Sequence, residues 1–91
     1  MDFEYDVEKS RINQNKHGVS FDEAQTVFED PWVMTILDPL HSIEEYRFVN
    51  LGYSNKGRLL IVIFTDRYDK IRIISSRKAN KDERKQYERR D

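Results

Sequence analysis

Cationic side chains are concentrated in the last part of the chain. The segment 70–90 reads KIRIISSRKANKDERKQYERR, which begins as a strand with alternating apolar residues and then becomes almost entirely charged. Arginine suits a site that holds phosphate, because its planar guanidinium donates two parallel hydrogen bonds and its charge does not depend on pH. These residue types point to a polyanionic ligand.

The charge is divided unevenly along the chain. Residues 1–45 contain 3 Lys/Arg and 11 Asp/Glu, a balance of −8, and residues 46–91 contain 13 and 6, a balance of +7, which together give −1. Either the basic half meets a polyanion such as a nucleic acid, or the two halves neutralise each other across one fold. Charge alone favours neither interpretation.

Composition excludes several classes of function. The 91 residues are expected to form a single domain, 1–91, and they include no cysteine and only two histidines, far apart. This excludes a disulfide framework, a thiol nucleophile and a cysteine-ligated zinc site, and we expect neither a metal nor a cofactor. No apolar run approaches the ~18 residues of a membrane span, and the acidic N-terminus differs from a signal peptide. A cytoplasmic protein without a membrane partner is expected.

The first element is predicted to be a short strand, DFEY, followed by a helix. Asp6 stands where an N-cap residue would accept a hydrogen bond from a free backbone amide, so the helix is predicted over about Val7 to His17. Gly18 can adopt the left-handed conformation that closes a helix.

A second helix is predicted after the sequence SFDE. In this capping-box pattern Ser20 and Glu23 satisfy each other's backbone amides, and apolar residues then recur on one helical face. Pro31 prevents continuation of the helix. Trp32, which follows, is expected in the core.

Beyond this point apolar residues alternate with a period of two. Strands are predicted over 33–37, 46–53, 58–65 and 70–77, and LLIVIF within the third is apolar at every position, which indicates a central strand covered on both faces. In the last strand, strict alternation assigns Ile71, Ile73, Ser75 and Arg77 to one face and Lys70, Arg72, Ile74 and Ser76 to the other.

The C-terminal segment is predicted to be a polar helix. Asn80 and Glu83 form a second capping-box pattern, and the helix is expected from Lys81 to about Arg90 with almost no apolar stripe. The expected fold class is therefore α+β, with a mostly antiparallel sheet, two N-terminal helices and one C-terminal helix.

Several segments together carry a family resemblance. They are FEYD with Lys9 and Asn13, then KHGVSFDEA, VFEDP, GRLLIVIFTDR, IRIISSRKA and ERKQYE. With these segments in this order, the chain resembles the BrnT toxins of bacterial type II toxin-antitoxin pairs, whose fold is similar to that of RelE-type ribonucleases. Where BrnT members often read EERF, this chain reads EEYRF. Tyr46 thus replaces the acid beside Arg47, and Glu45 lies one position earlier.

The resemblance implies metal-independent cleavage of RNA, in which the 2′-OH attacks the adjacent phosphate and a 2′,3′-cyclic phosphate is left. Such a site needs a proton acceptor, a proton donor and cations over the phosphorane. Arg67 and Arg77 are expected to stabilise the phosphate because they flank the same strand. Tyr87 is expected to stack on a base or transfer a proton, and His17 is the remaining catalytic candidate.

Further residues are candidates for binding RNA, namely Lys9, Arg72 and Arg84. Each site candidate also has a structural alternative: His17 would close its helix, Tyr87 would anchor the last helix, and the cations would be solvated or paired with the acidic half.

The implied partner is a BrnA-type antitoxin with a ribbon-helix-helix DNA-binding part, in a 2:2 complex that reaches operator DNA only through the antitoxin. The toxin would inhibit translation and growth. The competing hypothesis is a catalytically silent domain that binds RNA or the antitoxin and acts in transcriptional autoregulation.

Overall fold

The computed structural model describes residues 1–39 and 45–89. Its elements are β1 (Asp2–Glu4), α1 (Val7–His17), α2 (Phe21–Thr26), the 3-10 helix η1 (Val27–Glu29), β2 (Met34–Asp38), β3 (Arg47–Tyr53), β4 (Leu59–Arg67), β5 (Lys70–Lys78) and α3 (Lys81–Arg89). The last four strands begin and end within two residues of the predicted ranges, and Arg90, the expected end of the last helix, lies outside the described residues. Across 1–39 and 45–89, no helix has the length and apolar character needed to cross a bilayer.

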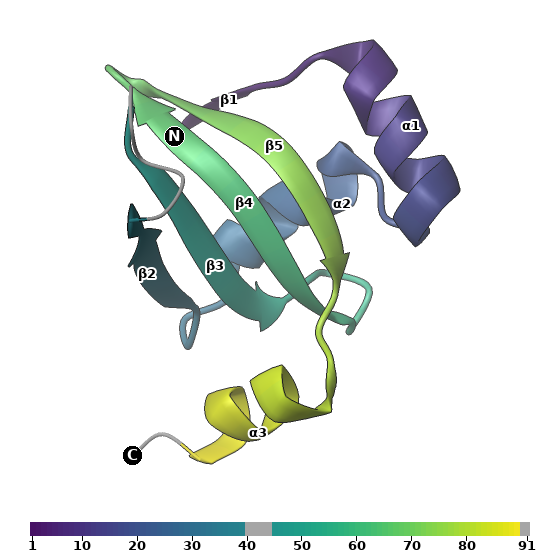
Figure 1. Ribbon diagram of the computed structural model, residues 1–91, viewed down its shortest axis with the longest axis vertical. Coiled ribbons are helices and arrows are strands. Elements are labelled where there is room, and N and C mark those ends of the chain that lie inside the picture. The colour runs from purple at the N-terminus through teal and green to yellow at the C-terminus, as the bar shows by residue number, and fades with distance from the viewer. Residues whose placement is uncertain (40–44, 90–91) are drawn as a thin grey trace.

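The strands form one sheet in the order β1-β5-β4-β3-β2 (Figure 1). The pair β1 and β5 is parallel, and the other three pairs are antiparallel. The predicted α+β class with a mostly antiparallel sheet is therefore confirmed. LLIVIF lies in β4, the central strand, and nearly all of it is buried, as its unbroken apolar run predicts.

Helices α1 and α2 cover one side of the sheet, which we call the helix face (Figure 1). Its core consists of Val19, Phe21, Ala24, Val27, Leu60, Val62, Phe64, Ile71 and Ile73. Asn13, which is 7% exposed, joins α1 to the sheet, because its amide donates to the carbonyls of Val19 and Ser76 at 2.8 Å each and its oxygen accepts from Ser76 N. The buried amide is thus fully paired, as burial of a polar group requires.

The helix starts have the predicted caps, with one difference. Asp6 accepts from Lys9 N at 3.1 Å, and Ser20 Oγ accepts from Glu23 N at 3.1 Å. The predicted return contact, from the Ser20 backbone amide to the Glu23 carboxylate, is wrong. The Glu23 carboxylate pairs with Arg58 and accepts from Ser54 Oγ at 2.7 Å. Glu23 is 4% exposed, and a buried carboxylate is better balanced by a guanidinium than by one amide.

Trp32 is not in the core, contrary to the prediction. It is 68% exposed. Its backbone N–H donates to Asp30 Oδ1 at 2.9 Å, which fixes a tight turn directly after η1. That turn leaves the indole in solvent, and Val33 packs against the core in its place.

A β-bulge in β5 changes which residues share a face. Ile63 pairs with Ser75 but Phe64 pairs with Ile73, so Ile74 is an extra residue without a partner in the register. One inserted residue reverses the alternation beyond it. The predicted faces are therefore wrong: Arg72 and Arg77 lie on the same side of the sheet.

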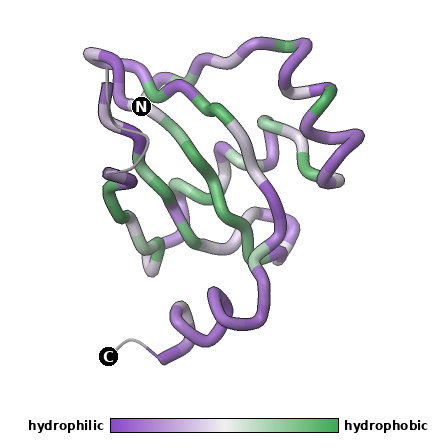
Figure 2. Tube along the Cα trace, in the orientation of Figure 1, coloured by the Kyte–Doolittle hydropathy of each residue, from purple (hydrophilic) through white to green (hydrophobic). Residues whose placement is uncertain are grey.

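We call that side the open face. By register it carries Asp2, Glu4, Met34, Ile36, Asp38, Arg47, Val49, Leu51, Tyr53, Leu59, Ile61, Ile63, Thr65, Arg67, Lys70, Arg72, Ser75 and Arg77. Its apolar centre packs against Ala79 and Tyr87, so α3 covers one end of the open face. Figure 2 shows α3 as hydrophilic along its length, whereas β4 is largely hydrophobic.

Candidate functional site

Three arginines from adjacent strands gather at the end of the open face away from α3. Arg47 on β3 pairs across the ladder with Thr65 on β4, and Thr65 pairs with Arg72 on β5. Arg67 is two residues beyond Thr65 on the same strand and therefore projects from the same face. We call Arg47, Arg67 and Arg72 the arginine cluster.

Glu45 lies against this cluster. Arg67 Nε and Nη2 donate to its two carboxylate oxygens at 3.0 and 2.8 Å, in the two-pronged geometry typical of arginine and a carboxylate. These hydrogen bonds lower the pKa of Glu45, and the charges of Arg67, Arg47 and Arg72 lower it further. The same contact raises the pKa of Arg67. The Glu45 carboxylate therefore interacts electrostatically with all three arginines of the cluster.

The acids of this row lie on the outer strands. Glu4 on β1 is the register partner of Arg72, and their charged atoms are 3.8 Å apart. At the other side, Asp38 on β2 is the register partner of Arg47. Positive charge is thus concentrated over β5, β4 and β3, with acids at the margins.

Arg77 lies at the opposite end of β5. It lies seven positions after Lys70, the register partner of Arg67, which is a span of about 20 Å at the rise of a strand. Its guanidinium donates to both oxygens of Glu83 at 2.8 Å each. Those hydrogen bonds lower the pKa of Glu83, whose Oε1 also accepts from Asn80 N at 2.8 Å. Arg77 therefore connects β5 to the first turn of α3.

Arg84 and Tyr87 project from α3 toward β3. The Tyr87 hydroxyl donates to Asp30 Oδ2 at 2.6 Å, an oxygen that also accepts from Tyr53 N. The rings of Tyr53 and Tyr87 meet edge to face at 5.3 Å, and Arg84 Nη1 donates to Tyr53 Oη at 3.2 Å. Arg84 and Tyr87 thus share one face of α3, and their contacts anchor this helix.

His17 and Lys9 lie elsewhere, in a pocket of about 230 Å³ between α1 and β5. Lys16 lines the same pocket, together with Ile74 and Ser75 from the bulge region. The helical period places residues 9 and 16 on one face of α1, so three basic side chains share this recess. The structure brings His17 together with Lys9 but not with the arginine cluster.

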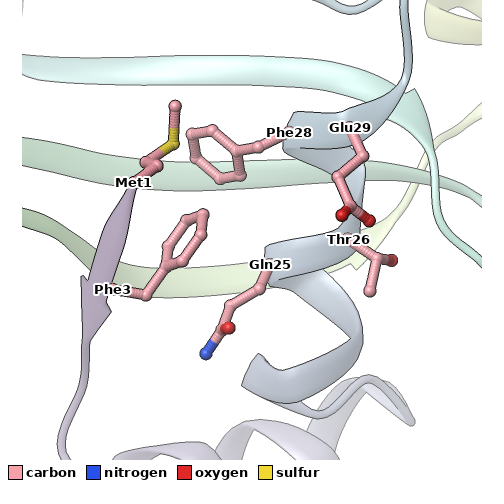
Figure 3. A pocket seen from close by; sticks show the side chains of 6 residues that line it. All are labelled: Met1, Phe3, Gln25, Thr26, Phe28 and Glu29. Atoms are coloured by element: carbon pink, nitrogen blue, oxygen red, sulfur yellow. The ribbon is translucent and has the colours of Figure 1, made fainter.

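An aromatic pocket of about 310 Å³ lies on the helix face between β1 and η1 (Figure 3). Phe3 and Phe28 meet there edge to face at 5.0 Å, beside Met1. None of the predicted site residues lines this pocket.

The predicted residues thus fall into three groups. Arg67 and Arg72 belong to the arginine cluster; Arg77, Arg84 and Tyr87 hold α3; and Lys9 and His17 line the α1 pocket. Arg47, Thr65 and Glu45 were not among the predicted site residues. The unusual EEYRF segment contains Glu45 and Arg47 and was the sequence signal for these two residues. No sequence signal pointed to Thr65.

Comparison with known proteins agrees with the family resemblance. No curated protein sequence matches the chain. The crystal structure of the Brucella abortus ribonuclease toxin BrnT superposes with a TM-score of 0.65 at 23% sequence identity, covering 89% of this chain and 99% of that chain. Residues 5–83 match the family described as the ribonuclease toxin BrnT of type II toxin-antitoxin systems. Since this match spans most of the 91 residues, the chain belongs to the BrnT family of ribonuclease toxins.

Proposed function

We propose that this chain is a metal-independent endoribonuclease that acts at the arginine cluster. The observation that carries the proposal is that three arginines from adjacent strands meet on the open face. In the reaction the RNA 2′-oxygen forms a bond to the adjacent phosphorus and the bond to the 5′-oxygen breaks. The 2′-OH proton passes to a base and the leaving oxygen receives a proton, so the products are a 2′,3′-cyclic phosphate and a 5′-hydroxyl.

Arginines suit this reaction because negative charge grows on the phosphorane oxygens in the transition state. Donors already held in place stabilise that charge without reorganising, and a guanidinium remains charged throughout. We assign phosphate binding to Arg67 and Arg72, with Arg47 as a third cation. The catalytic roles of Arg77, Tyr87 and His17, and RNA binding by Lys9 and Arg84, remain predictions to be tested by substitution.

The wider context is also part of the proposal. We infer a RelE-like single domain that acts in the cytoplasm, inhibits translation and growth, and is neutralised by a BrnA-type ribbon-helix-helix antitoxin in a 2:2 complex. Operator DNA would be contacted only through the antitoxin. A recess of about 110 Å³ supports a protein partner at α3, because it combines apolar residues of β2, β3 and β4 with Glu83 and Gln86.

One observation favours the alternative of a catalytically silent domain that binds RNA or antitoxin in autoregulation. Arg67 is paired with Glu45, Arg77 with Glu83, and Tyr87 with Asp30. An active enzyme must exchange at least the first of these contacts for substrate, whereas a silent domain can keep all three.

Cleavage in the presence of EDTA separates the two functions. The toxin, refolded after separation from its antitoxin, is incubated with labelled RNA, and the product ends are identified. The proposal expects cyclic phosphate and 5′-hydroxyl ends, and a loss of about 10²–10³-fold in Arg67→Ala. Arg11→Ala is the matched control, because Arg11 is an exposed arginine paired with Glu8 on α1. Absence of cleavage by the folded wild-type protein, or equal cleavage by both variants, contradicts the proposal.

A further inference from the structure

The hydroxyl of Thr65 is buried without a hydrogen-bond partner. Thr65 is 1% exposed, and within residues 1–39 and 45–89 its Oγ1 is the buried side-chain polar atom that no protein group satisfies. An unpaired buried hydroxyl destabilises the folded state, and proteins seldom carry such a group without a reason. A valine would fill the same volume without this destabilisation.

The position of Thr65 supplies the reason. Its cross-strand neighbours on the open face are Arg72 on one side and Arg47 on the other, with Cβ atoms of such pairs about 4.5–5.5 Å apart. Arg67, the next residue of β4 on this face, is the third arginine beside Thr65. By register, a small hydroxyl residue therefore stands between the three arginines of the cluster.

The chemistry of this centre selects an anion. Guanidinium groups are donors only, so they cannot accept the hydrogen of the Thr65 hydroxyl. The phosphodiester of RNA offers acceptor oxygens alone, and it could accept from Thr65 and from the arginines together. Among the described residues, the acids of the row, Glu4 and Asp38, lie on the outer strands, and Glu45 beside the cluster is held by Arg67.

The charged side chains beside Thr65 are partly exposed. The side chains of Arg67 and Glu45 are 44% and 41% exposed, and that of Arg72 is 30% exposed. Solvent screens an exposed ion pair and makes its contribution small, so an incoming phosphate can displace Glu45 at small cost.

We propose that Thr65 Oγ1 donates a hydrogen bond to a non-bridging oxygen of the RNA phosphate that the arginine cluster holds. Thr65 is then a substrate-binding residue at the base of a phosphate subsite, and Glu45 occupies the mouth of that subsite in the free protein. The inference rests on the proposed function for the identity of the phosphate. Binding of an anion at Thr65 does not depend on cleavage.

The test uses Thr65→Val, which removes the hydroxyl and keeps the shape of the side chain. Without ligand, its melting temperature should equal or exceed that of the wild type, because an unpaired buried polar group is replaced by a methyl group. Inorganic phosphate should raise the melting temperature of the wild type, relative to chloride at equal ionic strength, and should raise that of the variant much less. Cleavage in EDTA should fall about 10-fold or more, and Thr65→Ser should retain phosphate binding.

Thr35→Val is the control on the helix face, at an exposed threonine of β2. The hydroxyl of Thr35 has a partner, since it donates to Asn50 Oδ1 at 2.5 Å. This control should lower the melting temperature and leave phosphate binding unchanged. Thr65→Val is therefore expected to keep or raise the melting temperature and to weaken phosphate binding. Thr35→Val is expected to lower the melting temperature and to leave phosphate binding unchanged.

The outcomes separate the inference from the proposed function. If the wild type cleaves RNA, and Thr65→Val cleaves and binds phosphate equally well, the subsite is refuted and the ribonuclease stands. If phosphate protects the wild type but not Thr65→Val, and no cleavage occurs, the subsite is supported and the enzymatic proposal fails. A Thr65→Val protein that is less stable yet binds phosphate normally shows that the hydroxyl serves the fold, which overturns the inference.

Discussion

Replacing Arg77 by alanine should distinguish a role in the fold from a role in the reaction. The substitution removes two charge-assisted hydrogen bonds to Glu83 and the bond from Nη1 to the Lys78 carbonyl. The side chains of Arg77 and Glu83 are 42% and 20% exposed, so solvent screens much of their attraction. We expect a loss of about 1 kcal/mol of unfolding free energy, at the upper end for a surface pair because the geometry is two-pronged.

For a domain of this size a loss of 1 kcal/mol lowers the melting temperature by about 4–8 °C. Thermal unfolding of Arg77→Ala, Glu83→Ala and the double variant forms a double-mutant cycle, and the coupling term should account for most of the change. At 20 °C, where all variants are folded, cleavage per folded molecule by Arg77→Ala should exceed that by Arg67→Ala by at least 10-fold. Arg67 is the reference because it lies in the arginine cluster.

One result would refute this reasoning. If Arg77→Ala unfolds at the wild-type temperature and loses cleavage as completely as Arg67→Ala, its contact with Glu83 contributes little. The RNA path would then extend along the whole of β5, and the original assignment of Arg77 to phosphate stabilisation would be supported.

Three further predictions concern other parts of the molecule. Glu23→Gln should cost about 2–3 kcal/mol at neutral pH, below the 3–5 kcal/mol of a fully buried pair because Arg58 is 31% exposed. Hydrogen bonding from Arg58 lowers the pKa of Glu23 below its usual 4.5, so its stabilisation is complete above about pH 4.5 and disappears as pH falls through the lowered pKa. Urea titrations at several pH values should show the variant and the wild type converging in acid, and a constant difference would contradict this. Glu45→Gln should raise affinity for a non-cleavable 2′-O-methyl RNA several-fold by fluorescence anisotropy, because it removes the carboxylate paired with Arg67; weaker binding would show that the carboxylate does not compete with RNA. Gly52→Ala should lower the melting temperature, because a Cβ there would lie 3.0–3.2 Å from three side-chain atoms; an unchanged value would mean that the neighbours move apart at no cost.

Features that depend on nearby residues were predictable from the sequence. The N-cap at Asp6 and the left-handed glycine at Gly18, with φ of 72°, are set by a few adjacent positions. The central position of β4 follows from an apolar run that needs cover on both faces. The family itself was recognised from ordered segments, and the match over residues 5–83 confirms it.

Features that depend on distant residues were not predictable in the same way. Glu23 finds Arg58 across 35 positions, and no local pattern distinguishes that pairing from a capping box. The bulge at Ile74 involves no glycine, so strict alternation gave the wrong face for Arg72 relative to Arg77. Arg67 and Arg77 were expected to act together because they flank the same strand. An extended strand, however, places its two ends farther apart than a helix with the same number of residues.

The parallel pairing of β1 with β5 has a consequence for the synthesis of the toxin. Phe3, near the start of the chain, is the register partner of Ile71, so the sheet closes only after both segments are available. The row around Thr65 takes one residue from each of the five strands, from Glu4 to Arg72. Pairings between such distant segments form late, because a long loop must close before they contribute. A nascent chain that still lacks β5 therefore cannot assemble the row around Thr65, so the proposed phosphate subsite can form only after β5 has been synthesised.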